Sequence, residues 1–183
     1  MNLILVRPAA KYLPAYVAAL KRGYSPSTSR PEKRLQELEA IAADPDAFLA
    51  SCENFEGRGT PIKLRDGSHV APLPGLVRWM WDGDFAGVIA LRWQNGTPEL
   101  PEWCQGHVGY SVAPWKRRRG YATAALRFIL LEARQVGLPY VEVTTDPDNT
   151  ASQRVIAANG GVLLGRKAAA YGSSETLRYR IPL

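Results

Sequence analysis

Four consecutive basic residues, Lys116 to Arg119, precede Gly120 and a helical pattern. N–H groups in the first turn of a helix have no intrahelical partner, and the helix dipole adds positive potential there. Gly120 has no Cβ, so a ligand can approach the backbone closely. This loop therefore predicts a binding site for a pyrophosphate. The apolar stripe that follows is Ala122, Ala125, Leu126, Ile129, Leu130 and Ala133.

Three further segments accompany the basic loop in a fixed order. Val112-Ala113-Pro114 ends the preceding strand, Asp148 to Ser152 follows a second strand, and Asn159 to Val162 closes a second helix. The loop itself reads Arg117-x-x-Gly120-x-Ala122. With these neighbours it resembles the Arg/Gln-x-x-Gly-x-Gly/Ala signature of the GNAT superfamily of N-acetyltransferases. The chain looks most like the bacterial predicted-acetyltransferase branch of that superfamily.

This resemblance implies one N-acetyltransferase domain over residues 1–183. It divides into a variable N-terminal part at 1–75, which matches loosely, and an acetyl-CoA-binding core at 76–181. The implied fold is α/β (mixed α+β), with a central mixed, mostly antiparallel twisted sheet and helices on both faces. The implied reaction moves the acetyl group from acetyl-CoA to a primary amine by direct attack in a ternary complex. A non-catalytic module that senses acyl-CoA or binds nucleic acid is the alternative, and release of free CoA during turnover separates the two.

The resemblance also assigns the contacts to acetyl-CoA. Backbone groups of one strand would pair with the pantetheine arm and stabilise the thioester oxygen, the basic loop would bind the pyrophosphate, and the next helix start would lie near the departing sulfur. The residues in these three groups are Tyr110, Ser111 and Val112; Arg117, Arg118, Arg119, Gly120, Tyr121, Ala122 and Thr123; and Asn149 and Ser152.

Two side chains are candidates for the base that deprotonates the amine. Alternation places His107, Gly109 and Ser111 on one face of their strand, and an imidazole with a pKa near 6.5 can accept a proton near neutral pH. A structural histidine, hydrogen-bonded to a neighbouring loop, is the equal alternative. Glu142, on the adjacent predicted strand, is the second candidate.

The general acid of many GNAT enzymes is a tyrosine four residues after the serine of the Asn-x-x-Ser motif. That position is Ile156 in this sequence. Tyr171 is a candidate for the general acid in its place. The commoner explanation for a tyrosine at this position is that it is simply part of a turn. A free thiol has a pKa of about 8.5, so a thiolate can leave without a strong acid.

Acidic residues near the expected site suggest how an amine acceptor could be attracted. Glu99 and Glu102 lie in a polar loop, and Asp82 and Asp84 lie in a hairpin turn. Their carboxylates would favour a cationic amine, but ordinary solvated surface charges explain them equally well. The expected partner is a small-molecule or peptide amine acceptor, and a homodimer is possible.

Composition limits the other classes of function. The chain has 183 residues and a formal net charge of +6, and four of its positive charges lie in the basic loop. Nucleic acid is therefore a rival ligand, but the lack of a second basic cluster of similar density argues against it. Cys52 and Cys104 form no CxxC pattern, which argues against a zinc site and predicts no metal. No apolar stretch is long enough for a membrane span, so we expect a cytoplasmic protein without membrane contacts.

Periodicity and turn residues predict the elements that carry these groups. Residues 53–75 and 94–103 are expected to be irregular. Helices are expected at 9–20, 32–43, 121–136 and 149–159, with a short turn from Asp44 to Leu49. Strands are expected at 2–6, 76–81, 85–93, 106–112, 140–145, 162–164 and 177–181, and the first of these is expected to be buried.

Overall fold

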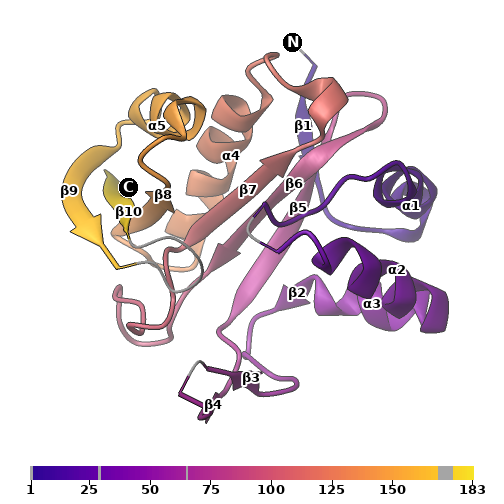
Figure 1. Cartoon of the computed structure of the whole chain (residues 1–183), viewed down its shortest axis with the longest axis horizontal. Helices are drawn as coiled ribbons and strands as arrows, with labels where there is room; N and C mark the ends of the chain where they lie inside the picture. The colour runs from indigo at the N-terminus through magenta and orange to yellow at the C-terminus, as the bar shows by residue number, and fades with distance from the viewer. Residues whose placement is uncertain (1, 29, 65, 169–174) are drawn as a thin grey trace.

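The computed structural model describes residues 2–28, 30–64, 66–168 and 175–183, and it places helices on both faces of an antiparallel sheet (Figure 1). The main sheet has the order β1-β5-β6-β7, with β2 paired to β5. A second sheet has the order β8-β10-β9, and β3 pairs with β4. The strands are β1 (Ile4–Val6), β2 (Glu53–Asn54), β3 (Ile62–Lys63), β4 (His69–Val70), β5 (Gly75–Trp81), β6 (Phe85–Arg92), β7 (Val108–Val112), β8 (Tyr140–Thr145), β9 (Val162–Lys167) and β10 (Thr176–Pro182).

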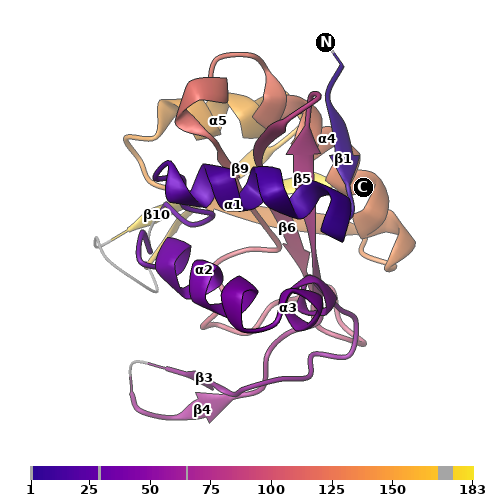
Figure 2. The ribbon, with the colours of Figure 1, turned by 90° about the vertical axis from the view of Figure 1, so that its right-hand side faces the viewer.

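The helices divide between the two faces of the main sheet. Those before the β5–β6 hairpin lie across one face, and those after β7 lie on the other (Figures 1 and 2). This arrangement confirms the predicted fold class. The helical segments are η1 (Ala10–Tyr12), α1 (Leu13–Lys21), α2 (Lys33–Ala43), α3 (Pro45–Ser51), η2 (Pro114–Lys116), α4 (Tyr121–Gln135) and α5 (Thr150–Ala157).

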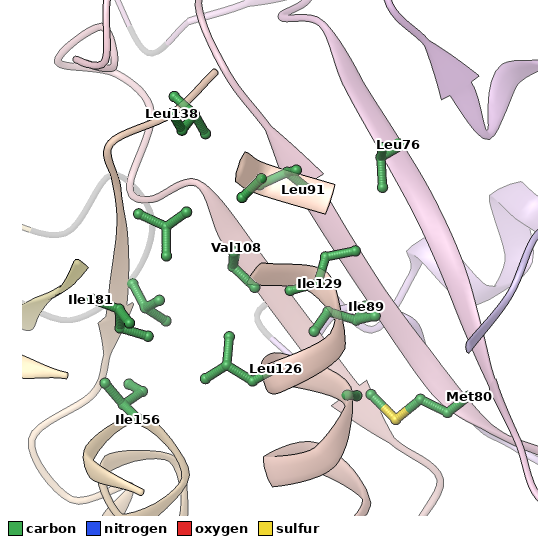
Figure 3. Packing of buried hydrophobic residues seen from close by; sticks show 14 of the residues in the cluster. Leu76, Met80, Ile89, Leu91, Val108, Leu126, Ile129, Leu138, Ile156 and Ile181 are labelled. Atoms are coloured by element: carbon green, nitrogen blue, oxygen red, sulfur yellow. The ribbon is translucent and has the colours of Figure 1, made fainter. Parts of the chain in front are cut away.

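Strand β6 is buried on both faces and separates two apolar cores. Ile89 is fully buried among side chains of α4, including Leu126 and Ile129 (Figure 3). The neighbouring Val88 points the other way, into a core built with α1. Side chains alternate across a strand, so consecutive residues serve opposite cores. The position of α4, and therefore of the loop before it, is fixed by this burial.

Three segments differ from the sequence-based expectation. The predicted buried strand at 2–6 is an edge strand of three residues in which Ile4 is 53% exposed, because β1 has a partner, β5, on one side. The predicted helix at 9–20 begins as the 3₁₀ turn η1, and Pro14 lies in the first turn of α1, where its missing N–H costs nothing. The irregular stretch at 53–75 contains the two-residue strands β2, β3 and β4. The turn around Tyr171 lies outside the described residues.

The core around α4 generates a stability prediction. Leu126 is 0% exposed, and Leu131, on the same helix, is 53% exposed. We expect Leu126→Ala to lower the free energy of unfolding by about 2–5 kcal/mol, because it leaves a cavity between helix and sheet. Leu131→Ala should change it by less than about 0.5 kcal/mol, as surface substitutions usually do. Urea unfolding of both variants measures the difference, and equal losses would contradict the assignment of α4 to the core.

Candidate active site

Strands β7 and β8 lie side by side but belong to different sheets (Figure 1). One backbone hydrogen bond joins them where β7 begins, from the His107 N–H to the Glu142 carbonyl at 2.7 Å. Gly106 permits this approach, since a Cβ at that position would lie 2.9 Å from the Glu142 oxygen. Beyond this bond, the described residues form no ladder between β7 and β8. We call the facing edges of the two strands the splay.

The backbone of β7 bonds alternately to β6 and toward the splay. The Arg92 N–H donates to the His107 carbonyl, and the Ala113 N–H donates to the Ala86 carbonyl. Within β7, the odd-numbered residues Gly109 and Ser111 therefore bond to β6, while the N–H groups of Tyr110 and Val112 face the splay. By the same alternation the backbone of Ser111 lies in the β6–β7 ladder. Tyr110, Ser111 and Val112 were expected to bind the pantetheine arm through their backbone groups. Of these, Tyr110 and Val112 have N–H groups that face the splay.

The basic loop has the backbone geometry of an anion site. Gly120 is the N-terminal cap of α4 and has a φ of 73°, in the left-handed region that glycine tolerates best. Arg118 also has a positive φ, 61°. The side chains of Arg117, Arg118 and Arg119 are exposed. The first intrahelical bond runs from the Ala124 N–H to the Gly120 carbonyl, so the N–H groups of residues 121–123 are available to a ligand.

Asp82 holds this loop against the β5–β6 hairpin. Lys116 Nζ contacts both carboxylate oxygens at 2.8 and 2.9 Å, and the Tyr121 hydroxyl donates to one of them at 2.6 Å. Burial acts to raise the pKa of Asp82, but the bonds from Lys116 and Tyr121 outweigh it and lower the pKa. Lys116 is therefore directed to Asp82. From the sequence, Asp82 was a candidate for attracting the amine. The sequence does not predict its contacts with Lys116 and Tyr121, because these residues are 34 and 39 positions away along the chain.

The N-terminus of α5 meets β7 through a tyrosine. Asn149 caps the helix by accepting from the Ser152 N–H at 3.0 Å, as the sequence motif suggests. The Tyr110 hydroxyl lies 2.7 Å from Ser152 Oγ. Burial raises the pKa of Tyr110, while the bond to Ser152 acts in the opposite direction. Ile156, at the usual position of the acid, is fully buried in the core beneath α5. Tyr171 lies outside the described residues.

The segment after α1 covers the other face of β7. Ser111 Oγ donates to the Ser25 carbonyl at 3.0 Å, and the Tyr24 hydroxyl donates to the Ser111 carbonyl at 3.1 Å. Tyr24 is 1% exposed, and burial is the main reason that its pKa is raised well above the usual value. In the sequence, Tyr24 lies between the helices expected at 9–20 and 32–43, where no element was predicted. A tyrosine within a polar, proline-containing segment was the one signal that this loop is anchored.

His107 is buried, and both of its ring nitrogens make hydrogen bonds. Nδ1 accepts from the Glu142 N–H at 2.9 Å, so Nε2, which lies 3.1 Å from the Pro98 carbonyl, carries the proton that it donates there. The residue is 1% exposed, and burial lowers the pKa of the imidazole. In this arrangement the imidazole has no free lone pair. These contacts are those of the structural alternative, a histidine bonded to the 94–103 loop.

Glu142 points away from α4, on the opposite side of β8 from the buried Val141 and Val143. One carboxylate oxygen accepts from Arg180 at 2.8 Å, and the other lies 3.9 Å from Arg178. The side chain is 14% exposed. It therefore lies in a polar environment on the face of the splay that α4 does not cover. Among the described residues, no group of three or more His, Cys, Asp or Glu side chains could hold a metal ion.

Comparison with known proteins agrees with this architecture. The family model described as "Acetyltransferase (GNAT) domain" matches residues 3–162. The search of curated proteins found no match.

No helix in the described part of the chain has the length and apolar character needed to cross a membrane.

Three solved structures are similar over almost the whole chain. The microcin C7 self-immunity acetyltransferase MccE, in complex with acetyl-CoA and AMP, is 14% identical, with a TM-score of 0.67 over 99% of this chain and 92% of its own. The ribosomal L7/L12 α-N-protein acetyltransferase RimL, in complex with coenzyme A, is 13% identical, with a TM-score of 0.65 over 100% and 95%. A chimera of the Vibrio cholerae spermidine N-acetyltransferase SpeG is 11% identical, with a TM-score of 0.64 over 100% and 96%.

At these identities the three structures establish a shared fold, whereas the family model covers most of the sequence itself. Its match includes the basic loop, the splay and the N-terminus of α5. The chain therefore belongs to the GNAT acetyltransferase family.

Proposed function

We propose that the chain transfers the acetyl group of acetyl-CoA to a primary amine by direct attack of the amine in a ternary complex. The observation that carries this proposal is the alignment of the splay with the basic loop at the start of α4. The unpaired edge of β7 runs from its contact with β8 to that loop, a length of roughly 17 Å at 3.3 Å per residue. An extended pantetheine arm with a pyrophosphate at its end matches these two features. MccE with acetyl-CoA and RimL with coenzyme A support the choice of donor.

In this proposal the backbone of β7 and the basic loop bind acetyl-CoA. The N–H groups of residues 121–123 and the guanidinium groups of Arg117, Arg118 and Arg119 bind the pyrophosphate. The N–H groups of Tyr110 and Val112 pair with the pantetheine amides. A β7 N–H also donates to the thioester oxygen as it gains negative charge during attack. Asn149 and Ser152 lie beside the sulfur end of the arm.

The reaction exchanges a carbon–sulfur bond for a carbon–nitrogen bond. The ammonium first gives up a proton, since an alkylamine has a pKa of roughly 10 and the protonated form has no lone pair. The amine attacks the thioester carbon, the carbon–sulfur bond breaks, and the nitrogen loses its second proton to become the amide nitrogen. The departing CoA thiolate takes a proton from the solvent. Ile156 has no proton to give, but a thiolate with an ordinary pKa of about 8.5 is an adequate leaving group without one.

We assign the base to Glu142, acting directly or through a water, and a positioning role to His107. Glu142 is on the face of β8 away from α4, from which an amine can approach, whereas both nitrogens of His107 are already bonded. The acceptor class is a primary amine on a small molecule or peptide. RimL, a protein α-N-acetyltransferase, and SpeG, a spermidine N-acetyltransferase, illustrate both kinds of acceptor among similar folds.

The donor site predicts stabilisation by acetyl-CoA. At a ligand concentration of about 100 times Kd the gain is near 2.7 kcal/mol, which corresponds to a rise in Tm of roughly 5–10 °C. Gly120→Val should abolish this rise, because it adds a Cβ where the phosphate approaches. Gly67→Val, at a glycine of similar positive φ in the β3–β4 hairpin, is the control that should retain it. The absence of any thermal shift with millimolar acetyl-CoA would remove the basis of the proposal.

The Asp82 contacts predict that this residue orders the donor site without touching the acceptor. Asp82→Asn replaces an ion pair and a charge-assisted hydrogen bond with weaker neutral contacts. We expect about a 10-fold rise in the Kd for acetyl-CoA, measured by calorimetry, and an unchanged acceptor KM. Asp84→Asn, in the same turn, is the control, because among the described residues the side chain of Asp84 accepts a hydrogen bond from the neighbouring Phe85 N–H and from no other group. A rise in acceptor KM alone would instead return Asp82 to the acceptor site.

The assignment of the base predicts opposite behaviour for two variants. Glu142→Gln should lower kcat by roughly 100-fold at neutral pH, with partial recovery at high pH, where the amine deprotonates unaided. His107→Gln should chiefly lower the free energy of unfolding, because it breaks the bonds to Glu142 and Pro98. Acetyl-CoA affinity, measured for both, controls for damage to the donor site. The reverse pattern, with kcat lost in His107→Gln and kept in Glu142→Gln, would make His107 the base.

A further inference from the structure

Arg92 places a guanidinium group on the face of β7 away from α4. A Cβ built on Gly109 would lie 3.2 Å from Nη2 of Arg92. The residues flanking Gly109, Val108 and Tyr110, point into the core beneath α4, so Gly109 faces the other way. No ion pair or side-chain hydrogen bond involves Arg92 among the described residues. This cation lies over the reacting strand without a carboxylate partner.

Two more arginines lie on the same face, across the splay. Arg180 pairs with Glu142 in the β8–β10 register, and Arg178 pairs with Thr144, two residues further along. Both point away from the core, because Tyr179 and Ile181 between and beside them are buried under α4. The side chains of Arg178 and Arg180 are each 40% exposed. The splay is thus bordered by guanidinium groups on both sides of this face.

The acidic groups nearby do not balance these charges. Glu142 serves both Arg178 and Arg180, as described above. Its hydrogen bond raises the pKa of Arg180, and Glu99 adds a smaller effect of the same sign. Arg180 stacks on the Tyr140 ring at 3.8 Å, and its Nε is buried with no hydrogen-bond partner in the described part of the chain. Lys167, whose Nζ donates to the Cys104 carbonyl, adds another cation at this edge.

The direction of approach decides what these cations can meet. The apolar core fills the face of the splay toward α4. That face ends at the basic loop before α4, which binds the pyrophosphate of the donor in the proposed function. The amine must then reach the thioester from the opposite face, between the Tyr24–Ser25 segment and β10. An acceptor with only positive charge would meet Arg92 and Arg178 there.

We propose that Arg92 and Arg178, together with Arg180, bind a carboxylate or phosphate group on the acceptor, which is therefore an anionic primary amine. This inference rests on the proposed function. The acceptor's ammonium group would face Glu142, while its anionic group is held by charge-assisted hydrogen bonds from the arginines. The net positive charge on this face favours such a zwitterion over a polyamine.

Matched amines test the proposal. We compare aminoethyl phosphate with ethanolamine, β-alanine with propylamine, and include spermidine, following CoA release. The anionic member of each pair should have a kcat/KM at least about 10-fold higher. Arg92→Gln and Arg178→Gln should each raise its KM about 10-fold, with the KM for acetyl-CoA unchanged, and the double variant should remove the preference. Arg127→Gln, an exposed arginine on α4, removes the same charge and should have no effect.

Binding provides a second readout that needs no turnover. With the chain saturated by CoA, calorimetry should show aminoethyl phosphate binding at least about 10-fold more tightly than ethanolamine. The Arg92→Lys variant should retain more of this difference in affinity than Arg92→Gln. Equal kinetics and equal binding within each pair, a preference for spermidine, or an anion preference that survives in the double variant would overturn this inference and leave acetyl transfer intact. Failure of acetyl-CoA to bind at all would instead overturn the proposed function.

Discussion

The architecture of the site depends on a single backbone hydrogen bond between two strands that then separate. An unpaired strand edge is normally a liability, because its N–H and C=O groups invite pairing with another chain. Here the edges of β7 and β8 face each other and are fixed at one end by the His107–Glu142 contact. The two sheets share one core beneath α4, which holds them together without a continuous ladder. The free N–H groups between them are therefore available to a ligand that can act as an extra strand.

The helix that follows β7 connects this opening to the anion site. Burial of Leu126 and Ile129 against β6 fixes the axis of α4 (Figure 3). The first turn of α4 is consequently directed at the end of the splay. Asp82 then holds the loop from outside through Lys116 and Tyr121. One basic residue of the run thus stabilises the loop, while the arginines after it remain exposed. A loop held in this way loses less conformational entropy when a phosphate binds.

Charge differs between the two faces of the splay in a way that suits two different substrates. Toward α4 the positive charge is concentrated in the basic loop and the helix N-terminus. On the opposite face, arginines from β6 and β10 surround one carboxylate, Glu142. The donor would thus lie along the splay with its pyrophosphate at the basic loop, and the acceptor would reach it from the opposite face. The Tyr24–Ser111 and Ser25–Ser111 bonds position the segment that borders the second face.

The sequence by itself determined the features that depend on local spacing. The strand before the basic loop, Gly120 at the start of α4, the apolar stripe of that helix and the Asn149 cap of α5 all follow from residues within a few positions of one another. Family membership followed from the same motifs. The β5–β6 hairpin was also predictable, because the Asp82-Gly83-Asp84 turn lies between two apolar runs.

Only the tertiary structure decided which side chains meet. His107 accepts from residue 142 and donates to residue 98, Asp82 pairs with residues 116 and 121, and Arg92 lies over Gly109 of the neighbouring strand. These contacts depend on strand register and on how two sheets pack against one helix, and neither is encoded in local periodicity. The exposed edge at Ile4 has the same origin, since an apolar run does not reveal whether its strand has one neighbour or two. A histidine on a strand looks the same in sequence whether its nitrogens are free or bonded, because the partners that occupy them come from distant parts of the chain.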